Sequence, residues 1–159
     1  MNNRDTGALY NDCWPTLSPA GWDDEDMAKI LVIDDNEDLR DTIVSVLDDE
    51  GYETVFAPDG ATGVRVFGEA RPDLVITDLI MPKSNGLDTI RDIKAIDPKA
   101  RIVAMSGGSL ISHEYYLDVA STLGAMHVLP KPFEIDELVR VVAECLKAPL
   151  PAPGSSSTF

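Results

Sequence analysis

Short apolar runs, repeated at intervals along the chain, constrain its fold more than any other feature. The five runs are rich in Ile, Val, Leu and other apolar residues, and they cover Ile30–Ile33, Thr54–Ala57, Leu74–Thr77, Ile102–Met105 and Met126–Leu129. A continuous apolar run of this length suits a strand that is buried on both faces, as in a parallel sheet. We therefore predict five strands.

A helix-like segment follows each run. The last is the clearest, with apolar residues at helical spacing at Ile135, Leu138, Val139, Val142 and Leu146. Five strand–helix units in succession predict an α/β fold, because right-handed crossovers then give a parallel sheet with helices on both faces. We expect a flavodoxin-like, doubly wound five-stranded parallel sheet of order 2-1-3-4-5 with five helices.

Turn residues predict where these elements stop. Gly51 and Gly124 are expected to end two of the helices. Met81–Gly86 and Pro130–Pro132 have the composition of loops, so we expect the chain to turn there. A helix is expected from about Leu110 to Leu123.

The two ends of the chain differ in composition from the middle. Residues 1–27 are polar and acidic, and residues 149–159 are rich in Pro and Ser. We expect a flexible N-terminal extension, one folded domain over residues 28–148, and a C-terminal tail. No apolar run approaches the roughly 20 residues needed to span a membrane, and the N-terminus lacks the apolar segment of a secretory signal. These features predict a soluble, cytoplasmic protein without membrane insertion.

The chain is strongly acidic. Lys and Arg number 13 against 28 Asp and Glu, which gives a net charge of −15. Affinity for nucleic acids comes mostly from Lys and Arg that neutralise phosphates, so we expect no direct DNA binding. The sequence contains no CxxC motif and no Cys/His cluster, so a zinc site would have no ligands.

Polar residues that can carry chemistry stand at or near the ends of four of the five apolar runs. They are Asp34, Asp35, Asp78, Ser106 and Lys131. In open α/β sheets, ligands bind beyond the carboxyl ends of the strands. We therefore expect these side chains to meet at one edge of the sheet.

The chemistry of these residues indicates a Mg²⁺ and phosphoryl site. Three carboxylates at one edge need a cation, and Mg²⁺ suits a site with few carboxylates and several waters. Lys131 adds a positive charge and Ser106 a hydroxyl donor. No His base or Ser–His pair accompanies them, whereas phosphoryl transfer to an oxygen nucleophile such as Asp78 needs only these groups.

The motifs resemble those of a known family. Asp34-Asp35, Thr77–Pro82 (TDLIMP), Ser106-Gly107 and Lys131–Phe133 (KPF) resemble the receiver domain of bacterial two-component response regulators, of the single-domain, chemotaxis-regulator-like kind. The resemblance covers about residues 28–148. It implies a signalling protein that accepts a phosphoryl group autocatalytically and is not a turnover enzyme.

The resemblance also implies a role for each site residue. Asp78 would accept the phosphoryl group from a sensor histidine kinase or phosphotransfer protein. Asp35, Asp78 and the backbone carbonyl of Ile80 would bind Mg²⁺ directly, and Asp34 would act mainly through water. Ser106 would move to hydrogen-bond the phosphoryl group, and Lys131 would offset its charge.

Two further expectations follow from the resemblance. The Lys131–Pro132 peptide is expected to be cis. The fourth helix, fifth strand and fifth helix are expected to form the output face, which would bind an as yet unknown downstream protein and could form a homodimer.

The chain departs from the family pattern at a few positions. Val128 stands where the family has a switch aromatic residue, so Tyr115 or Tyr116 is a candidate substitute for the missing ring. Ile80 and Gly108 carry no polar group that could position an attacking water, so we predict slow self-dephosphorylation.

Two other functions fit parts of the pattern. A Mg²⁺-dependent aspartyl-phosphate phosphatase would need a second Asp two residues after the nucleophile, where this chain has Ile80. A receiver-like interaction module that is never phosphorylated would be expected to lack Asp78 or Lys131. By itself, Asp34-Asp35 could also be a simple helix cap or solvated turn.

Overall fold

The computed structural model describes residues 27–82, 84–107 and 113–147. In chain order its elements are β1 (Lys29–Ile33), α2 (Glu37–Asp49), β2 (Glu53–Ala57), α3 (Gly60–Ala70), β3 (Leu74–Asp78), β4 (Ile80–Met81), β5 (Ser84–Asn85), α4 (Gly86–Ile96), β6 (Ile102–Gly107), α5 (His113–Thr122), β7 (His127–Lys131) and α6 (Ile135–Lys147). The domain boundaries expected at residues 27–28 and 148–149 adjoin parts of the chain outside these residues, so they stay predictions.

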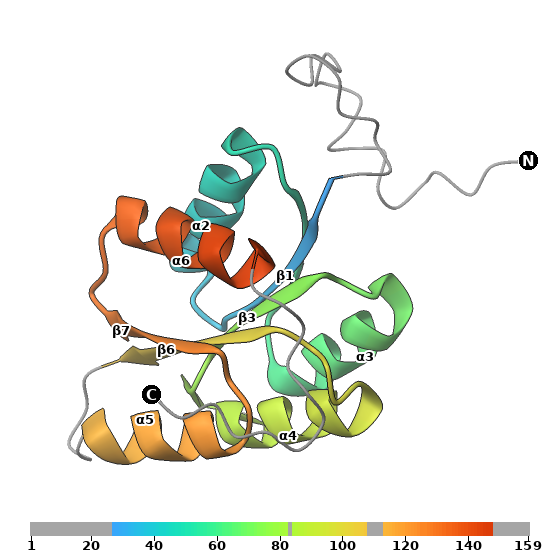
Figure 1. The fold of residues 1–159 in the computed structure, drawn as a ribbon, viewed down its shortest axis with the longest axis vertical. Helices are drawn as coiled ribbons and strands as arrows, with labels where there is room; N and C mark the ends of the chain where they lie inside the picture. Colours follow the sequence, from blue (N-terminus) through green and yellow to red (C-terminus); the bar gives the residue numbers. More distant parts are fainter. Residues whose placement is uncertain (1–26, 83, 108–112, 148–159) are drawn as a thin grey trace, which may run out of the picture.

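Five parallel strands form the central sheet. Their order is β2-β1-β3-β6-β7, which is the predicted 2-1-3-4-5 arrangement when the strands of this sheet are counted along the chain. Helices α2 and α6 cover one face, and α3, α4 and α5 cover the other (Figure 1). The predicted flavodoxin-like fold is therefore confirmed.

The core consists of two apolar layers, one on each side of the sheet. Alternate residues of the central strands point to opposite faces, so Ile30 and Val32 pack toward α2 and α6, while Leu31 and Ile33 pack toward α3 and α4. Because both faces are covered, the central strands read as continuous apolar runs. Among the described residues, no helix is long and apolar enough to cross a bilayer.

Local sequence signals set the helix ends. The Asn36 side chain accepts a hydrogen bond from the Leu39 amide at 3.1 Å and caps α2, and the Asp59 side chain caps α3 through the Thr62 amide at 2.7 Å. Gly51 has a φ of +91° just beyond α2, a backbone conformation that a residue with a Cβ adopts only at a cost.

The structure corrects three details of the expected elements. β6 and β7 each continue two residues further than the apolar runs, so Ser106 and Lys131 lie within strands. Pro130 also lies within β7 and not in a turn, which a strand at the margin of the sheet tolerates. The segment expected to be only a loop contains the short antiparallel pair β4–β5, with Ile80 opposite Asn85.

The helix expected from about Leu110 to Leu123 is α5, and in the described residues it covers His113–Thr122. The start expected for it at Leu110 lies outside the described residues.

Candidate functional site

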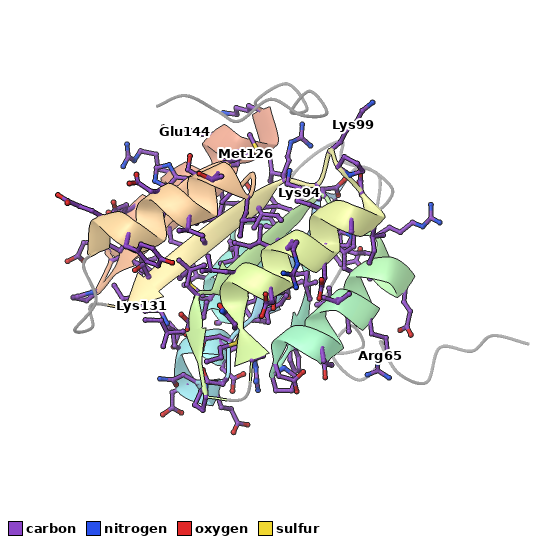
Figure 2. The ribbon with its side chains drawn as sticks, turned by 90° about the horizontal axis from the view of Figure 1, so that it is seen from below. Arg65, Lys94, Lys99, Met126, Lys131 and Glu144 are labelled. Atoms are coloured by element: carbon purple, nitrogen blue, oxygen red, sulfur yellow. The ribbon has the colours of Figure 1, made fainter. Side chains whose placement is uncertain are left out.

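The candidate site lies at the edge of the sheet where β1, β3, β6 and β7 end. These strands are adjacent and parallel, so their C-terminal ends meet at that edge. Asp78 is the last residue of β3 and Lys131 the last of β7, while Asp34 and Asp35 directly follow β1. Figure 2 shows Lys131 at one end of the sheet and Lys99 toward the opposite end.

Three carboxylates meet at this edge. One oxygen from each of Asp34, Asp35 and Asp78 lies within 4.8 Å of the others. Asp34 is fully buried and Asp78 is 5% exposed, whereas Asp35 is exposed. Negative charges this close, two of them largely removed from water, require positive charge nearby.

Lys131 supplies that charge in the structure. Its Nζ lies 3.1 Å from Asp78 Oδ2 and 3.3 Å from Asp34 Oδ2, and its side chain is largely buried. The ammonium therefore bridges the ends of β1 and β3 from the end of β7. The predicted meeting of these three residues is observed.

Opposing effects act on the pKa of the Asp78 carboxyl group. Burial raises its pKa above the ordinary value of 3.8, and the nearby Asp34 charge acts in the same direction. The Lys131 ammonium and the Ile80 N–H, which donates to Asp78 Oδ1 at 3.2 Å, oppose this by lowering the pKa. Lys131 thus favours the ionised, nucleophilic form of Asp78.

Three hydrogen bonds, from the turn after β1, from β7 and from α2, hold Asp34 in place. Its Oδ1 accepts a hydrogen bond from the Asn36 amide at 2.9 Å, and its Oδ2 contacts Lys131. Its backbone carbonyl accepts a hydrogen bond from Arg40 Nη1 at 3.3 Å. Asp34 is therefore a fixed part of the site, while Asp35 projects from the same turn toward solvent.

The segment after Asp78 is held close to the site. Ile80 pairs with Asn85 across β4–β5, and Gly60 N–H donates to Ser84 Oγ at 3.0 Å. Gly86 packs directly against the Asp78 carbonyl, where a Cβ would collide with the backbone. These contacts set the path of the backbone at Ile80, whose side chain is 38% exposed.

Ser106 lies on β6, the strand between β3 and β7. It is one residue beyond Met105, which pairs with Asp78, and it pairs with Pro130 next to Lys131. Ser106 is 2% exposed. The strand register therefore places it beside the Asp78–Lys131 contact, as predicted.

The donor set fits a hard divalent cation. Converging carboxylate oxygens with one exposed member match the preference of Mg²⁺ for a few carboxylates plus water. The Ile80 backbone adjoins these carboxylates, since its N–H donates to Asp78 Oδ1 at 3.2 Å. Zinc would instead favour Cys or His ligands, which this group of residues does not include.

Two features of the predicted switch can be placed. Val128 is half-buried on β7 and pairs with Ala104, so an aliphatic side chain occupies the position of the family's aromatic residue. Tyr115 is 54% exposed on α5. The side chain of Tyr116 and the whole of Gly108 lie outside the described residues, so the substitute-ring hypothesis stays a prediction. The Lys131–Pro132 peptide is cis, as expected.

An apolar groove of about 410 Å³ adjoins the site, between α2 and the start of α6. Its lining consists of Asn36, Leu39, Ile43, Lys131, Pro132, Phe133 and Ile135. Lys131 therefore lines the groove and also contacts Asp34 and Asp78 in the acidic site.

One buried residue near the site was missed in the sequence. Arg40 is 8% exposed, and its guanidinium lies over the Phe56 ring, 4.9 Å from the ring centre. The available signal was its spacing, because Arg40 falls three residues before Ile43 and seven before Leu47, on the buried face of α2.

Comparisons with known proteins agree with this geometry. A family model for the response regulator receiver domain matches residues 30–143. The DNA-binding transcriptional regulator NtrC of Azospirillum brasilense is 38% identical over 78% of this chain, which spans only 25% of that relative's length.

Two further matches cover nearly the full length of the other protein. The sporulation initiation phosphotransferase F of Bacillus subtilis is 31% identical over 74% of this chain and 93% of its own length. The crystal structure of a response regulator receiver domain protein from Clostridium thermocellum has a TM-score of 0.70 and 33% identity, covering 76% of this chain and 94% of its own. The chain therefore belongs to the response regulator receiver domain family.

Proposed function

We propose that this chain accepts a phosphoryl group on Asp78 and signals through the change that follows at its surface. One observation carries the proposal. The Asp78 carboxylate is nearly buried, yet it contacts both the Lys131 ammonium and the Ile80 amide and lies beside two other carboxylates. Membership of the receiver family supports it.

The proposed donor is the phosphohistidine of a sensor histidine kinase or phosphotransfer protein. An Asp78 carboxylate oxygen forms a bond to phosphorus while the phosphorus–nitrogen bond of the donor imidazole breaks, and the electron pair of that bond stays on the nitrogen. Lys131 keeps Asp78 ionised before transfer and offsets the added negative charge afterwards.

Mg²⁺ is the proposed cofactor. Asp35, Asp78 and the Ile80 carbonyl would hold it, and Asp34 would act through water. When bound, it neutralises charge on the phosphoryl oxygens as the group is transferred.

Ser106 is proposed to detect phosphorylation of Asp78, because its hydroxyl would donate a hydrogen bond to the phosphoryl oxygens. Its movement would bias the face formed by α5, β7 and α6 between two states. That face is the proposed contact for a downstream protein and for a second copy of the chain. With a net charge of −15, direct binding of this chain to DNA is not part of the proposal.

The proposed activity is a single transfer to the protein and not repeated turnover. An aspartyl-phosphate phosphatase would need an acid where the exposed Ile80 stands. In a multiple-turnover assay on phosphomonoesters, we expect no phosphate release above that of the Asp78→Asn variant.

The proposal is tested by incubating the chain with Mg²⁺ and acetyl phosphate. We expect intact-mass measurement to show one added phosphoryl group on the wild type and none on Asp78→Asn. EDTA should abolish the labelling of the wild type. Equal labelling of both proteins would overturn the assignment of the acceptor.

A further inference from the structure

Arg40 is a buried cation on α2, next to the acidic edge of the sheet. A guanidinium removed from water is costly unless its donors and charge are well matched. Arg40 is 8% exposed, and its contacts are with the Asp34 carbonyl, the Phe56 ring and, more distantly, Asp41. These contacts indicate what the residue does.

The contacts join three elements at the start of the site. Arg40 extends from α2, its Nη1 donates to the Asp34 carbonyl at 3.3 Å, and its Cζ lies 4.9 Å from the centre of the Phe56 ring on β2. Phe56 pairs with Val32, two residues before Asp34. The Phe56 ring therefore packs against the same guanidinium that donates to the Asp34 backbone.

Charge pairing does not account for the burial. Arg40 Nε is buried without a hydrogen-bond partner among the residues that the structure describes, and its nearest carboxylate oxygen, Asp41 Oδ1, is 4.0 Å away. That separation is too long for a hydrogen bond. A long apolar side chain would pack here without leaving a buried N–H unsatisfied. Compared with such an apolar side chain, Arg40 adds a donor to the Asp34 carbonyl.

We propose that Arg40 is a positioning residue for the divalent-cation site. By fixing the Asp34 backbone, it holds the Asp34 and Asp35 carboxylates at the separation from Asp78 that the cation requires. This inference rests on the proposed function, since it assumes that the acidic edge binds Mg²⁺.

When Arg40 is replaced, the proposed positioning role and a simple effect of charge predict opposite changes in Mg²⁺ affinity. A positive charge near the acidic edge repels Mg²⁺, so its removal alone would strengthen Mg²⁺ binding. Loss of a contact that orients the ligands would weaken it, typically by 10-fold to 100-fold where such supporting residues have been removed. A role in stability alone would lower the resistance to urea and leave the affinity unchanged.

The test measures Mg²⁺ affinity by calorimetry on the metal-free full chain, with urea unfolding in parallel. The Arg40→Met variant keeps the length of the side chain and removes its donors and charge. We expect it to bind Mg²⁺ about 10-fold more weakly or worse. Arg65→Met is the control, because Arg65 is exposed on α3 and lies away from Lys131 in Figure 2; it should bind as the wild type does.

Arg40→Lys separates position from charge. Lys keeps the charge but lacks the planar fork that can donate to a carbonyl while lying on a ring. Positioning therefore predicts weaker binding in this variant too, whereas a charge effect predicts no change. If Arg40→Met does not fold, the Mg²⁺ affinity of Arg40→Lys alone decides between the two explanations.

Hydrogen exchange gives a second readout. The Asn36 N–H donates to Asp34 Oδ1, so its exchange should be faster in both Arg40 variants. Affinities equal to or tighter than wild type in Arg40→Met and Arg40→Lys would overturn the positioning role. Absence of Mg²⁺ binding by the wild-type chain would instead overturn the proposed metal site.

Discussion

Replacement of Lys131 by Met is the perturbation whose effect can be worked out most fully from the structure. The ammonium lies 3.1 Å from Asp78 Oδ2 and 3.3 Å from Asp34 Oδ2. At an effective dielectric constant of about 20, each contact is worth ~5 kcal/mol before the desolvation cost is subtracted. Removing one partner of a buried ion pair typically costs about 3–5 kcal/mol.

The side chain of Lys131 is 20% exposed, so the lower end of that range applies. We expect Lys131→Met to lose about 3 kcal/mol of unfolding free energy at neutral pH in the absence of Mg²⁺. Saturating Mg²⁺ should recover most of this loss, because it supplies positive charge to the same oxygens.

The loss should depend on pH with a definite sign. Burial raises the pKa of Asp78 above 3.8, so the folded protein holds this proton more tightly than the unfolded chain does. The protonated Asp78 therefore contributes to the stability of the fold below about pH 3.8, the ordinary pKa, and this contribution is lost as the pH rises through the pKa of the folded state. Without Lys131 the pKa of Asp78 is higher still. The free energy of unfolding of the variant should therefore approach that of the wild type in acid and fall increasingly below it toward neutral pH.

The assay is urea unfolding in EDTA and in Mg²⁺, measured at several pH values from acid to neutral. Lys99→Met is the matched control, because Lys99 is exposed and lies toward the opposite end of the sheet (Figure 2); surface changes of this kind stay within about 0.5 kcal/mol. If Lys131→Met were as stable as the wild type at neutral pH without Mg²⁺, the bridging contacts would not hold in solution.

Three further predictions concern readout, lifetime and packing. Ser106→Ala should still be labelled by acetyl phosphate but should lose the phosphorylation-dependent change in hydrogen exchange over α5 and β7; an unchanged response would exclude Ser106 as the reader. The acyl phosphate of the wild type should be long-lived, and Ile80→Asn should shorten its half-life several-fold in a phosphate-release assay; a wild-type half-life of only seconds would refute this. Gly63→Ala should lose about 1–3 kcal/mol by urea unfolding, because its Cβ would collide with Ile33, whereas Gly68→Ala, which meets open space in the same helix, should gain about 0.5–1 kcal/mol.

The fold could be predicted because its signals are local and repeated. A strand buried on both faces leaves a continuous apolar run, and Asn36 and Asp59 are residue types that favour helix starts. The parallel order then follows from the connection rules. The β4–β5 pair was missed, because two-residue strands produce no periodicity and Ile80–Asn85 contains strong turn residues.

The site could be predicted as a set of strand-end residues, but its contacts could not. The sequence places Asp78 and Lys131 at one edge, whereas the bridge from Lys131 to Asp34 depends on the packing of side chains 97 residues apart. Arg40 was missed for a related reason. A charged residue on a helix is usually exposed, and only the ring of Phe56 and the Asp34 carbonyl make its burial understandable.

The central claim, that Asp78 is the phosphoryl acceptor, is tested most directly by locating the acyl phosphate. The chain is incubated with acetyl phosphate and Mg²⁺ and then reduced with borohydride, which converts an aspartyl phosphate to homoserine, and its peptides are analysed by mass spectrometry. We expect homoserine at position 78, and none when EDTA replaces Mg²⁺. Homoserine at Asp34 or Asp35 with position 78 unmodified would contradict the assignment.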